Sequence, residues 1–329
     1  MNITEIKQKI ENGAFDKDFS MLYGDVNAAR ARYTAACDSF CDIFSERDNI
    51  RLFSAPGRTE VGGNHTDHQH GCVLAGGVNL DVIAVVAPNN DGKVRIKSEG
   101  YDMDTVDICK LEKDESEHGC ASALIRGVLS RFKELGCTLS GFNAYTTSNV
   151  LKGSGLSSSA AFEVLVGNIV NGMFFEAKAD EITVAKIGQY AEREYFGKPC
   201  GLLDQMASSL GGFTYADFFD PAEPITEKIN LDIHSFGYTL CVVDTGGNHA
   251  NLTQDYADIT IECKKISNAL GVDFLRDADS ERFYNSISEL RRSCGDRAVL
   301  RAFHFFNEQN RVEALKAALK SGDFESFLK

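Results

Sequence analysis

Residues 153–160 form a glycine- and serine-rich segment, Gly-Ser-Gly-Leu-Ser-Ser-Ser-Ala. Its glycines allow tight, partly left-handed turns, and its serines stand where a helical pattern begins. Such a junction points backbone N–H groups and the positive end of a helix dipole at one spot, which suits a phosphate group. The segment is not a Walker A loop, because the G-x-x-x-x-G-K-[ST] spacing is absent. A serine that only caps the following helix is an equally open alternative.

Charged and polar side chains also gather after the Pro-Gly pair that precedes Arg58. His65 and Asp67 follow two consecutive glycines, which suggest a backbone that folds closely around something small. His68 and His70 add side chains of the kind that bind metal ions, so a metal site is a minor alternative. A polar turn without any ligand is the simpler interpretation of these histidines.

Asp204 follows the tripeptide Pro-Cys-Gly, at the start of another expected helix. A lone aspartate at such a junction is usually a helix N-cap. An aspartate held beside an arginine instead stays ionised, because the opposite charge favours the anion. It can then accept a proton from a sugar hydroxyl, or orient that hydroxyl toward a phosphate. The local sequence does not choose between a cap and a catalyst.

The elements that must hold these residues read as a mixture of helices and strands. Residues 1–48 are amphipathic and helical in pattern, and residues 72–88 form a nearly continuous β-branched run, typical of a strand buried on both faces. Further helices are expected after residue 157, over 181–196 and over 253–270, and a further strand over 236–245. The pattern predicts an α+β fold in two domains, residues 1–215 and 216–329.

The composition narrows the class of protein. The 329-residue chain carries 34 Lys and Arg against 48 Asp and Glu, a net charge of −14. This balance argues against nucleic-acid and anionic-membrane surfaces, which require a basic face. No apolar run reaches the length of a membrane span, and the first residues lack the pattern of a secretory signal. The 10 scattered cysteines read as reduced thiols, so we expect a cytoplasmic protein.

These three segments, taken in their order along the chain, resemble the motifs of the GHMP small-molecule kinases, and among them those of the galactokinase family. Residues 56–68 follow the pattern P-G-R-x-N-x-I-G-E-H-x-D-Y with departures. Residues 153–160 match G-x-G-L-S-S-S-A throughout, and residues 199–205 match P-C-G-x-x-D-Q. The resemblance continues to Tyr256 and covers residues 50–265. Each motif is moderately specific, and three in order are highly specific.

The resemblance implies an enzyme that uses ATP to phosphorylate galactose at its anomeric hydroxyl, giving galactose 1-phosphate. Asp204 would be the catalytic aspartate, and Arg58 would hold it ionised and stabilise charge on the moving phosphoryl group. The resemblance assigns the sugar to Asn64, His65, Asp67, Gly201 and Tyr256, the ATP to Gly153, Ser154, Gly155, Leu156, Ser157 and Ser158, and Mg²⁺ to Ser159 and Glu192.

The same resemblance implies the two-domain GHMP kinase architecture, with a mixed-sheet N-terminal domain and a ferredoxin-like C-terminal domain. We expect a monomer whose partners are galactose and ATP, without nucleic acid or membrane. The family's closing Gly-rich motif does not occur before Lys329, so the C-terminal domain is expected to be truncated or divergent.

One replacement within the first motif bears on the substrate, because Asn64 stands where the family has a sugar-binding glutamate. Glu60 and Gly62 also replace the usual Asn and Ile, which indicates only an altered packing of the loop. An asparagine can still form hydrogen bonds, but it lacks the charge that strengthens them, so the hydroxyl preference can differ. A kinase for a related sugar, such as N-acetylgalactosamine or arabinose, is therefore one alternative.

A catalytically silent sensor of sugar and ATP is an alternative of another class, although a pure sensor needs neither Arg58 nor Asp204. A metal-binding α/β protein is the weakest alternative.

Overall fold

The computed structural model describes residues 1–150, 153–243 and 253–329, without the side chains of Thr253, Gln254 and Tyr256. These residues form two compact units. The first consists of Met1–Gly57, Val78–Lys152 and Leu156–Cys200, and the second of Arg58–Gly77, Gly153–Gly155 and Gly201–Lys329. Residues 58–77 thus group with the later part of the chain. The continuous domains predicted at 1–215 and 216–329 stay a prediction.

The first unit contains a mixed sheet, as the sequence predicts. Its strands come from β1 (Arg51–Gly62), β2 (Cys72–Pro88), β3 (Lys93–Ser98), β4 (Met103–Asp107) and β5 (Phe142–Ser148). The strand order is β4-β3-β5-β2, and β1 also pairs with β2. The β3–β5 pair is parallel, while β3–β4 and β2–β5 are antiparallel.

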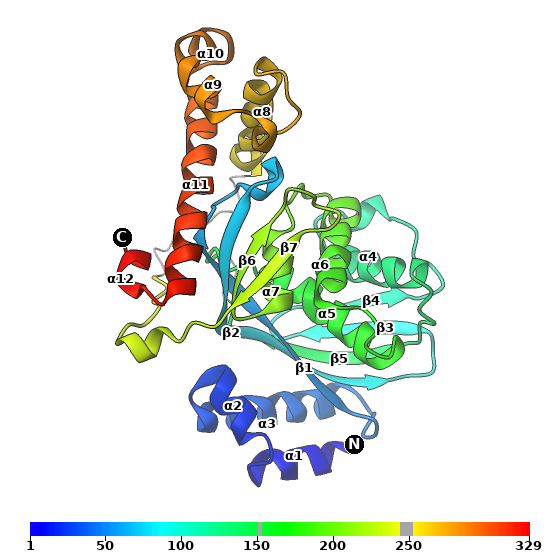
Figure 1. Ribbon diagram of the computed structural model, residues 1–329. Helices are drawn as coiled ribbons and strands as arrows, with labels where there is room; N and C mark the ends of the chain where they lie inside the picture. The colour runs from blue at the N-terminus through cyan, green and yellow to red at the C-terminus, as the bar shows by residue number, and fades with distance from the viewer. Residues whose placement is uncertain (151–152, 244–252) are drawn as a thin grey trace. The chain divides into compact units, whose positions relative to one another are not determined.

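Helices cover both faces of this sheet (Figure 1). On one face lie α1 (Ile3–Glu11), α2 (Asp16–Tyr23) and α3 (Val26–Ile43); on the other lie α4 (Ala121–Glu134), α5 (Ser158–Phe174) and α6 (Glu181–Tyr190), followed by a π-helical turn over Ala191–Phe196. Two helices begin at aspartate N-caps, Asp25 for α3 and Asp180 for α6, as their side-chain chemistry favours.

Strand β2 is apolar at successive positions because both of its faces are buried. Ile83 and Val85 pack with the N-terminal helices, whereas Ala84 and Val86 pack in the core on the opposite face. Because successive side chains of a strand point to opposite faces, a strand covered on both sides needs apolar residues without alternation. The predicted strand buried on both faces is confirmed.

The second unit pairs the start of β2 with β6 (Phe213–Asp217), and β6 with β7 (Ile225–Ile229), both antiparallel. The helices of this unit are α7 (Leu203–Leu210), α8 (Thr253–Ala269), α9 (Ser280–Asn285), α10 (Ile287–Cys294), α11 (Asp296–Ser321) and α12 (Phe324–Phe327). Helices α8, α9 and α10 pack along the N-terminal part of the long α11 (Figure 1). Further along α11, Val312 packs with Leu74 and Tyr215 of the sheet.

The strand predicted over 236–245 is not formed in its described part, residues 236–243. Tyr238, Leu240 and Val242 are instead about half exposed, at 50%, 48% and 46%. A strand needs a hydrogen-bonded neighbour, and none of the described strands pairs with this segment. β7 is consequently the one strand after residue 217 in the described ranges. The expected truncation of the C-terminal domain stays a prediction.

Within the same described ranges, no helix is both long enough and apolar enough to cross a membrane.

Candidate active site

Arg58 and Asp204 meet in the second unit, although 146 positions separate them in the sequence. The Arg58 guanidinium donates to Asp204 Oδ1 from Nε at 2.8 Å and from Nη2 at 2.6 Å, and its Nη1 donates to the Gly155 carbonyl. The Arg58 side chain is 8% exposed and that of Asp204 31%, so a ligand can reach the carboxylate while the cation stays buried. Burial lowers the pKa of Arg58, but the charges of Asp204 and Glu60 outweigh it, and the net pKa is raised.

Asp204 is not the N-cap of α7, so the capping interpretation is wrong. The N-cap position is Leu202, and Asp204 is the second helical residue. A carboxylate in the first turn is favoured by the helix dipole, and here it also neutralises a buried guanidinium.

Glu60 also contacts Arg58, a role that the sequence reasoning missed. Arg58 Nη2 donates to Glu60 Oε1 at 3.1 Å, and the glutamate side chain is 10% exposed. Burial raises the pKa of Glu60, Arg58 and His65 lower it, and the net pKa is raised. A usable signal was present, because residues two apart on a strand share a face. Two carboxylates therefore share one guanidinium.

The Asp67 carboxylate lies against the start of α7. Its Oδ2 accepts the backbone N–H of Leu203 at 3.2 Å, and its side chain is 9% exposed. A Cβ at Gly201 would overlap this carboxylate, so glycine at 201 is what allows Asp67 to approach. Two predicted sugar-binding residues, Asp67 and Gly201, are thus brought together.

The two glycines before His65 pack closely against other parts of the protein. A Cβ at Gly63 would overlap the Cys72 carbonyl and lie 3.1 Å from Val312 Cγ2, and one at Gly62 would lie 2.9 Å from Leu315 Cδ1. We refer to residues 62–72 as the 62–72 loop. Its backbone packs against α11 and the start of β2. The expectation that this backbone also folds closely around something small stays a prediction.

Other parts of the 62–72 loop remain accessible. Asn64 and His65 are exposed, and His65 has a left-handed backbone, with φ at 56°. The buried Thr66 hydroxyl donates to the carbonyls of Gly63 and Cys72, both at 2.9 Å, which closes the loop on itself. The loop therefore presents Asn64 and His65 from a fixed base.

The histidines of this loop do not form a metal site in the part of the chain that the structure describes. No group of three or more His, Cys, Asp or Glu side chains there is placed to hold a metal ion. The His70 ring instead stacks on Phe274, with ring centroids 3.6 Å apart. Burial lowers the pKa of His68, while Asp67 raises it, and the net pKa is lowered.

The glycine- and serine-rich segment leads into α5. Gly153 and Gly155 both have φ at 77°, and Ser157, at the N-cap position, also has a left-handed backbone with φ at 56°. The Ser157 side chain makes no capping hydrogen bond to α5. The serine-cap interpretation therefore does not explain Ser157, and the helix presents its positive end beside Ser158 and Ser159.

Ser159 and Glu192 lie together in the first unit. The Ser159 hydroxyl donates to Glu192 Oε1 at 3.1 Å, and Glu192 comes from the π-helical turn that follows α6. The Glu192 side chain is 1% exposed, and Lys198 Nζ donates to the same oxygen at 2.8 Å. The resemblance did not assign Lys198, whose ammonium compensates this buried carboxylate.

Tyr256 belongs to α8, but its side chain lies outside the described residues. Its predicted contact with the sugar stays a prediction.

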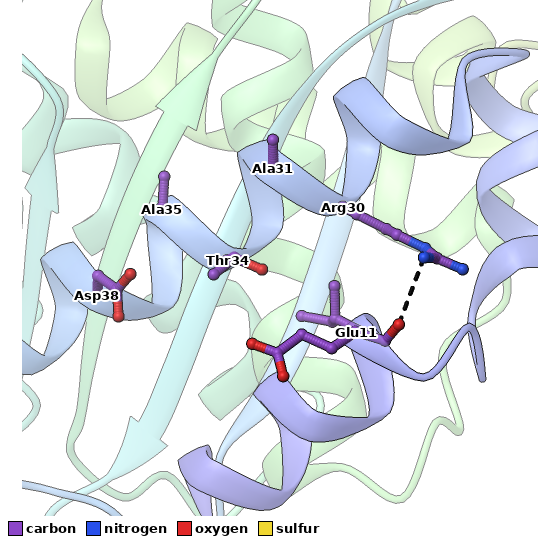
Figure 2. Close-up of a pocket in the computed structure, with 7 residues that line it drawn as sticks. Glu11, Arg30, Ala31, Thr34, Ala35 and Asp38 are labelled. Carbon is purple, nitrogen blue, oxygen red and sulfur yellow. Dashed lines mark hydrogen bonds between the residues drawn. The ribbon is translucent and has the colours of Figure 1, made fainter.

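A hollow of about 530 Å³ on the N-terminal helices holds none of the predicted site residues (Figure 2). It is lined by Ile10, Glu11, Arg30, Ala31, Thr34, Ala35 and Asp38. Figure 2 shows Arg30 reaching from α3 to the Glu11 carbonyl, a hydrogen bond of 3.3 Å. Arg30 also pairs with Asp16, and Asp38 with Lys7, so these charges are compensated within the protein. We do not place the substrate there.

Two family profiles match the chain. The GHMP kinases N terminal domain matches residues 123–212, which include the glycine- and serine-rich segment and Asp204. The galactokinase galactose-binding signature matches residues 38–88, which include Arg58 and the 62–72 loop.

Comparisons with individual proteins point to the same family. Galactokinase of Streptomyces coelicolor is 32% identical over 274 residues, spanning 83% of this chain and 70% of that protein. Galactokinase of Lactobacillus helveticus is 32% identical over 283 residues, spanning 83% and 71%. A crystal structure of Lactococcus lactis galactokinase complexed with galactose has a TM-score of 0.73 at 22% identity, covering 90% of this chain and 76% of that one, which shows a common fold. An identity of 32% across 83% of the chain is a family relationship, and this chain belongs to the galactokinases, sugar kinases of the GHMP fold.

Proposed function

We propose that this protein transfers the terminal phosphoryl group of ATP to the anomeric hydroxyl of galactose. The observation that carries the proposal is the Arg58–Asp204 pair, in which a buried guanidinium contacts a carboxylate whose side chain is 31% exposed. Phosphoryl transfer needs a group that receives or orients the acceptor hydroxyl and a cation that offsets charge on the phosphoryl oxygens. This pair supplies both.

In this proposal Asp204 is the group that meets the sugar. A sugar hydroxyl placed within hydrogen-bond reach donates to the Asp204 carboxylate, which orients the nucleophile and takes up its proton as the oxygen–phosphorus bond forms. Arg58 keeps the carboxylate anionic before transfer and stabilises the negative charge that develops on the phosphoryl group. Glu60 accepts from the same Nη2 that donates to Asp204, and so helps to fix the guanidinium.

ATP is assigned to the segment from Gly153 to Ser158. Positive φ values at Gly153, Gly155 and Ser157 turn the backbone into the N-terminus of α5, where the helix dipole favours phosphate oxygens. Ser158 and Ser159, the first two residues of the helix, add hydroxyl donors at the same point.

Mg²⁺ fits the oxygen pair formed by Ser159 and Glu192. A hydroxyl and a buried carboxylate 3.1 Å apart are hard oxygen ligands, and Mg²⁺ commonly binds one or two such groups together with substrate phosphates and waters. When bound, the ion neutralises charge on the phosphates. Lys198 donates to the same carboxylate oxygen at 2.8 Å, so its ammonium would compete with a bound cation for that oxygen.

The sugar is assigned to the exposed end of the 62–72 loop, with Asn64, His65 and Asp67, and to Gly201 and Tyr256. Asn64 lacks the charge of a glutamate, so hydrogen bonds to a sugar hydroxyl there are weaker. A related sugar, such as N-acetylgalactosamine or arabinose, is the second candidate substrate, and Asn64 is the observation that favours it.

The test is ADP release by the purified protein with ATP, Mg²⁺ and a panel of sugars. Galactose-dependent turnover is expected to fall at least about 100-fold in Asp204→Ala, as for loss of a general base. Arg58→Ala should lower turnover by about 100-fold or more while changing ATP affinity far less. Arg95→Ala is the matched control, because Arg95 makes an ion pair with Asp91 on the first unit's sheet.

Three results would contradict the proposal in different ways. Turnover with another sugar and not with galactose would show that galactose is not the substrate. Binding of galactose and ATP without turnover would indicate the sensor. An equal loss of turnover and ATP affinity in Arg58→Ala would reduce Arg58 to a binding residue.

We further propose a cytoplasmic monomer. The ten cysteines are all free thiols, which supports a reducing compartment. Light scattering during size-exclusion chromatography tests the monomer, and a mass of two chains would contradict it.

A further inference from the structure

Helix α11 contacts the 62–72 loop through a buried carboxylate that no motif of the sequence indicates. Glu308 Oε2 accepts the backbone N–H of Gly63 at 2.8 Å, across 245 positions of sequence. Glu308 is only 4% exposed, and its other oxygen pairs with Arg311. A buried carboxylate is retained where its charge meets a donor, and a backbone N–H is a donor that otherwise stays unsatisfied.

His304 makes a second contact one helical turn earlier. Its Nε2 lies 2.9 Å from the Asn64 carbonyl oxygen, and a carbonyl only accepts, so Nε2 carries the proton. His304 and Glu308 are four residues apart, on one face of α11. They thus hold the N–H of Gly63 and the C=O of Asn64, the two ends of this dipeptide.

The dipeptide needs such support because of its glycine. Gly63 has φ at 83°, and a glycine adopts positive φ values about as readily as negative ones, so its backbone is free to change conformation. Its N–H bond to Glu308 removes that freedom, and Val312 and Leu315 pack against the same stretch of backbone. The next residues along the chain are Asn64 and His65, whose side chains are exposed.

We propose that Glu308 is a positioning residue for sugar binding: through the Gly63 N–H it fixes the backbone that presents Asn64, His65 and Asp67, with His304 holding the adjacent carbonyl. This inference rests on the proposed function, in which the 62–72 loop contacts the sugar. It makes α11 a determinant of sugar affinity although Glu308 itself touches no substrate.

The experiment compares Glu308→Ala, Glu308→Gln and Glu262→Ala. Glu262 is the matched control, because it is also a buried carboxylate on a helix of the second unit and its ion pairs go to Arg297 and Arg301. Glu308→Ala is expected to raise the KM for the sugar about ten-fold, with kcat and the KM for ATP within about two-fold. Glu308→Gln keeps an acceptor oxygen and should recover most of the loss. Glu262→Ala should lower the melting temperature and leave the sugar KM unchanged.

A second readout does not depend on activity. Backbone hydrogen exchange over residues 62–72 should become faster in Glu308→Ala and stay unchanged in Glu262→Ala. If the wild-type protein turns over no sugar, the proposed function fails, and the exchange data still decide whether Glu308 holds the loop. If Glu308→Ala does not fold, the exposed His304→Ala carries the test, with an expected rise of about three-fold in sugar KM.

Unchanged exchange in the 62–72 loop of a folded variant would overturn the proposal. So would a sugar KM that moves no more in Glu308→Ala than in Glu262→Ala, or an equal rise in the KM values for sugar and ATP. The last result would mean a general loss of structure instead of a local effect on the sugar.

Discussion

Gly63 and Gly155 belong to two motif segments of the second unit and have similar backbones, with φ at 83° and 77°. Their surroundings differ. A Cβ at Gly63 would overlap the Cys72 carbonyl and lie 2.8 Å from Val73 Cα, whereas a Cβ at Gly155 would meet nothing within 4 Å. Gly63 is therefore required for close packing of backbone on backbone, and Gly155 for its conformation alone. The 62–72 loop is packed into the protein, whereas no described atom would contact a Cβ at Gly155.

The largest expected effect comes from Gly63→Ala. The added methyl group meets two backbone atoms that cannot rotate away, and the left-handed backbone adds strain. We expect the free energy of unfolding to fall by on the order of 3 kcal/mol or more, measured by urea denaturation. A loss below about 1 kcal/mol would show that the loop relaxes, and the contrast with Gly155 would disappear.

Gly201→Ala should have an intermediate effect, mainly on the sugar. The new Cβ would overlap the Asp67 carboxylate, which is the end of a movable side chain and can swing away. Asp67 then loses its hydrogen bond to Leu203, so we expect a stability loss of about 1 kcal/mol and a rise of about ten-fold in sugar KM. Steady-state kinetics with varied galactose measure this. Asp67→Asn keeps the acceptor oxygen, and a similar loss of stability in that variant would contradict this explanation.

Gly155→Ala should lower stability less than Gly63→Ala does, and it should specifically weaken ATP binding. Only the left-handed backbone is strained, which costs about 1 kcal/mol. Gly100→Ala is the matched control, because Gly100 has φ at 78° and its Cβ would also meet nothing within 4 Å. Both variants should lose similar stability in thermal unfolding, and Gly155→Ala alone should weaken ATP binding in calorimetry. Equal ATP affinity in the two would argue against phosphate binding at this segment.

The smallest expected effect is a pH dependence at the 62–72 loop. Burial lowers the pKa of His68 below its ordinary 6.5, so the unfolded chain takes up a proton at this residue before the folded protein does. The resulting stability is present above pH 6.5 and is lost as the pH falls below it. His68→Gln should flatten this part of a stability profile from pH 7.5 to 5 by no more than about 1 kcal/mol. The same change at the exposed His234 should leave the profile as it is.

The local sequence pattern predicted an element correctly where the pattern itself indicates what packs against that element. Successive apolar residues in β2 indicated burial on both faces, because period-two geometry leaves no other reason for them. The resemblance placed Arg58 and Asp204 at one site, and they are hydrogen-bonded in the structure. Their catalytic roles stay a prediction. Glu60 could have been found from the same strand geometry.

Other features depend on contacts that a local pattern cannot show. Nothing near Glu308 indicates that its carboxylate meets Gly63, because the contact depends on how α11 packs. The segment 236–243 has the residues of a strand, yet no described strand pairs with it. A high β-propensity means that the residues fit a sheet, but it does not indicate whether a neighbouring strand is present to pair with them.

Because Gly63 and Glu308 are far apart in the chain, they are synthesised at different times. At about 5 to 20 residues per second, Glu308 is made roughly 10 to 50 s after Gly63. Until then the Gly63 N–H lacks its acceptor, and the backbone that carries Asn64 and His65 has no helix to hold it. The first motif to emerge from the ribosome is thus among the last to take its final form, and competence to bind sugar should arrive late and abruptly in the growing chain.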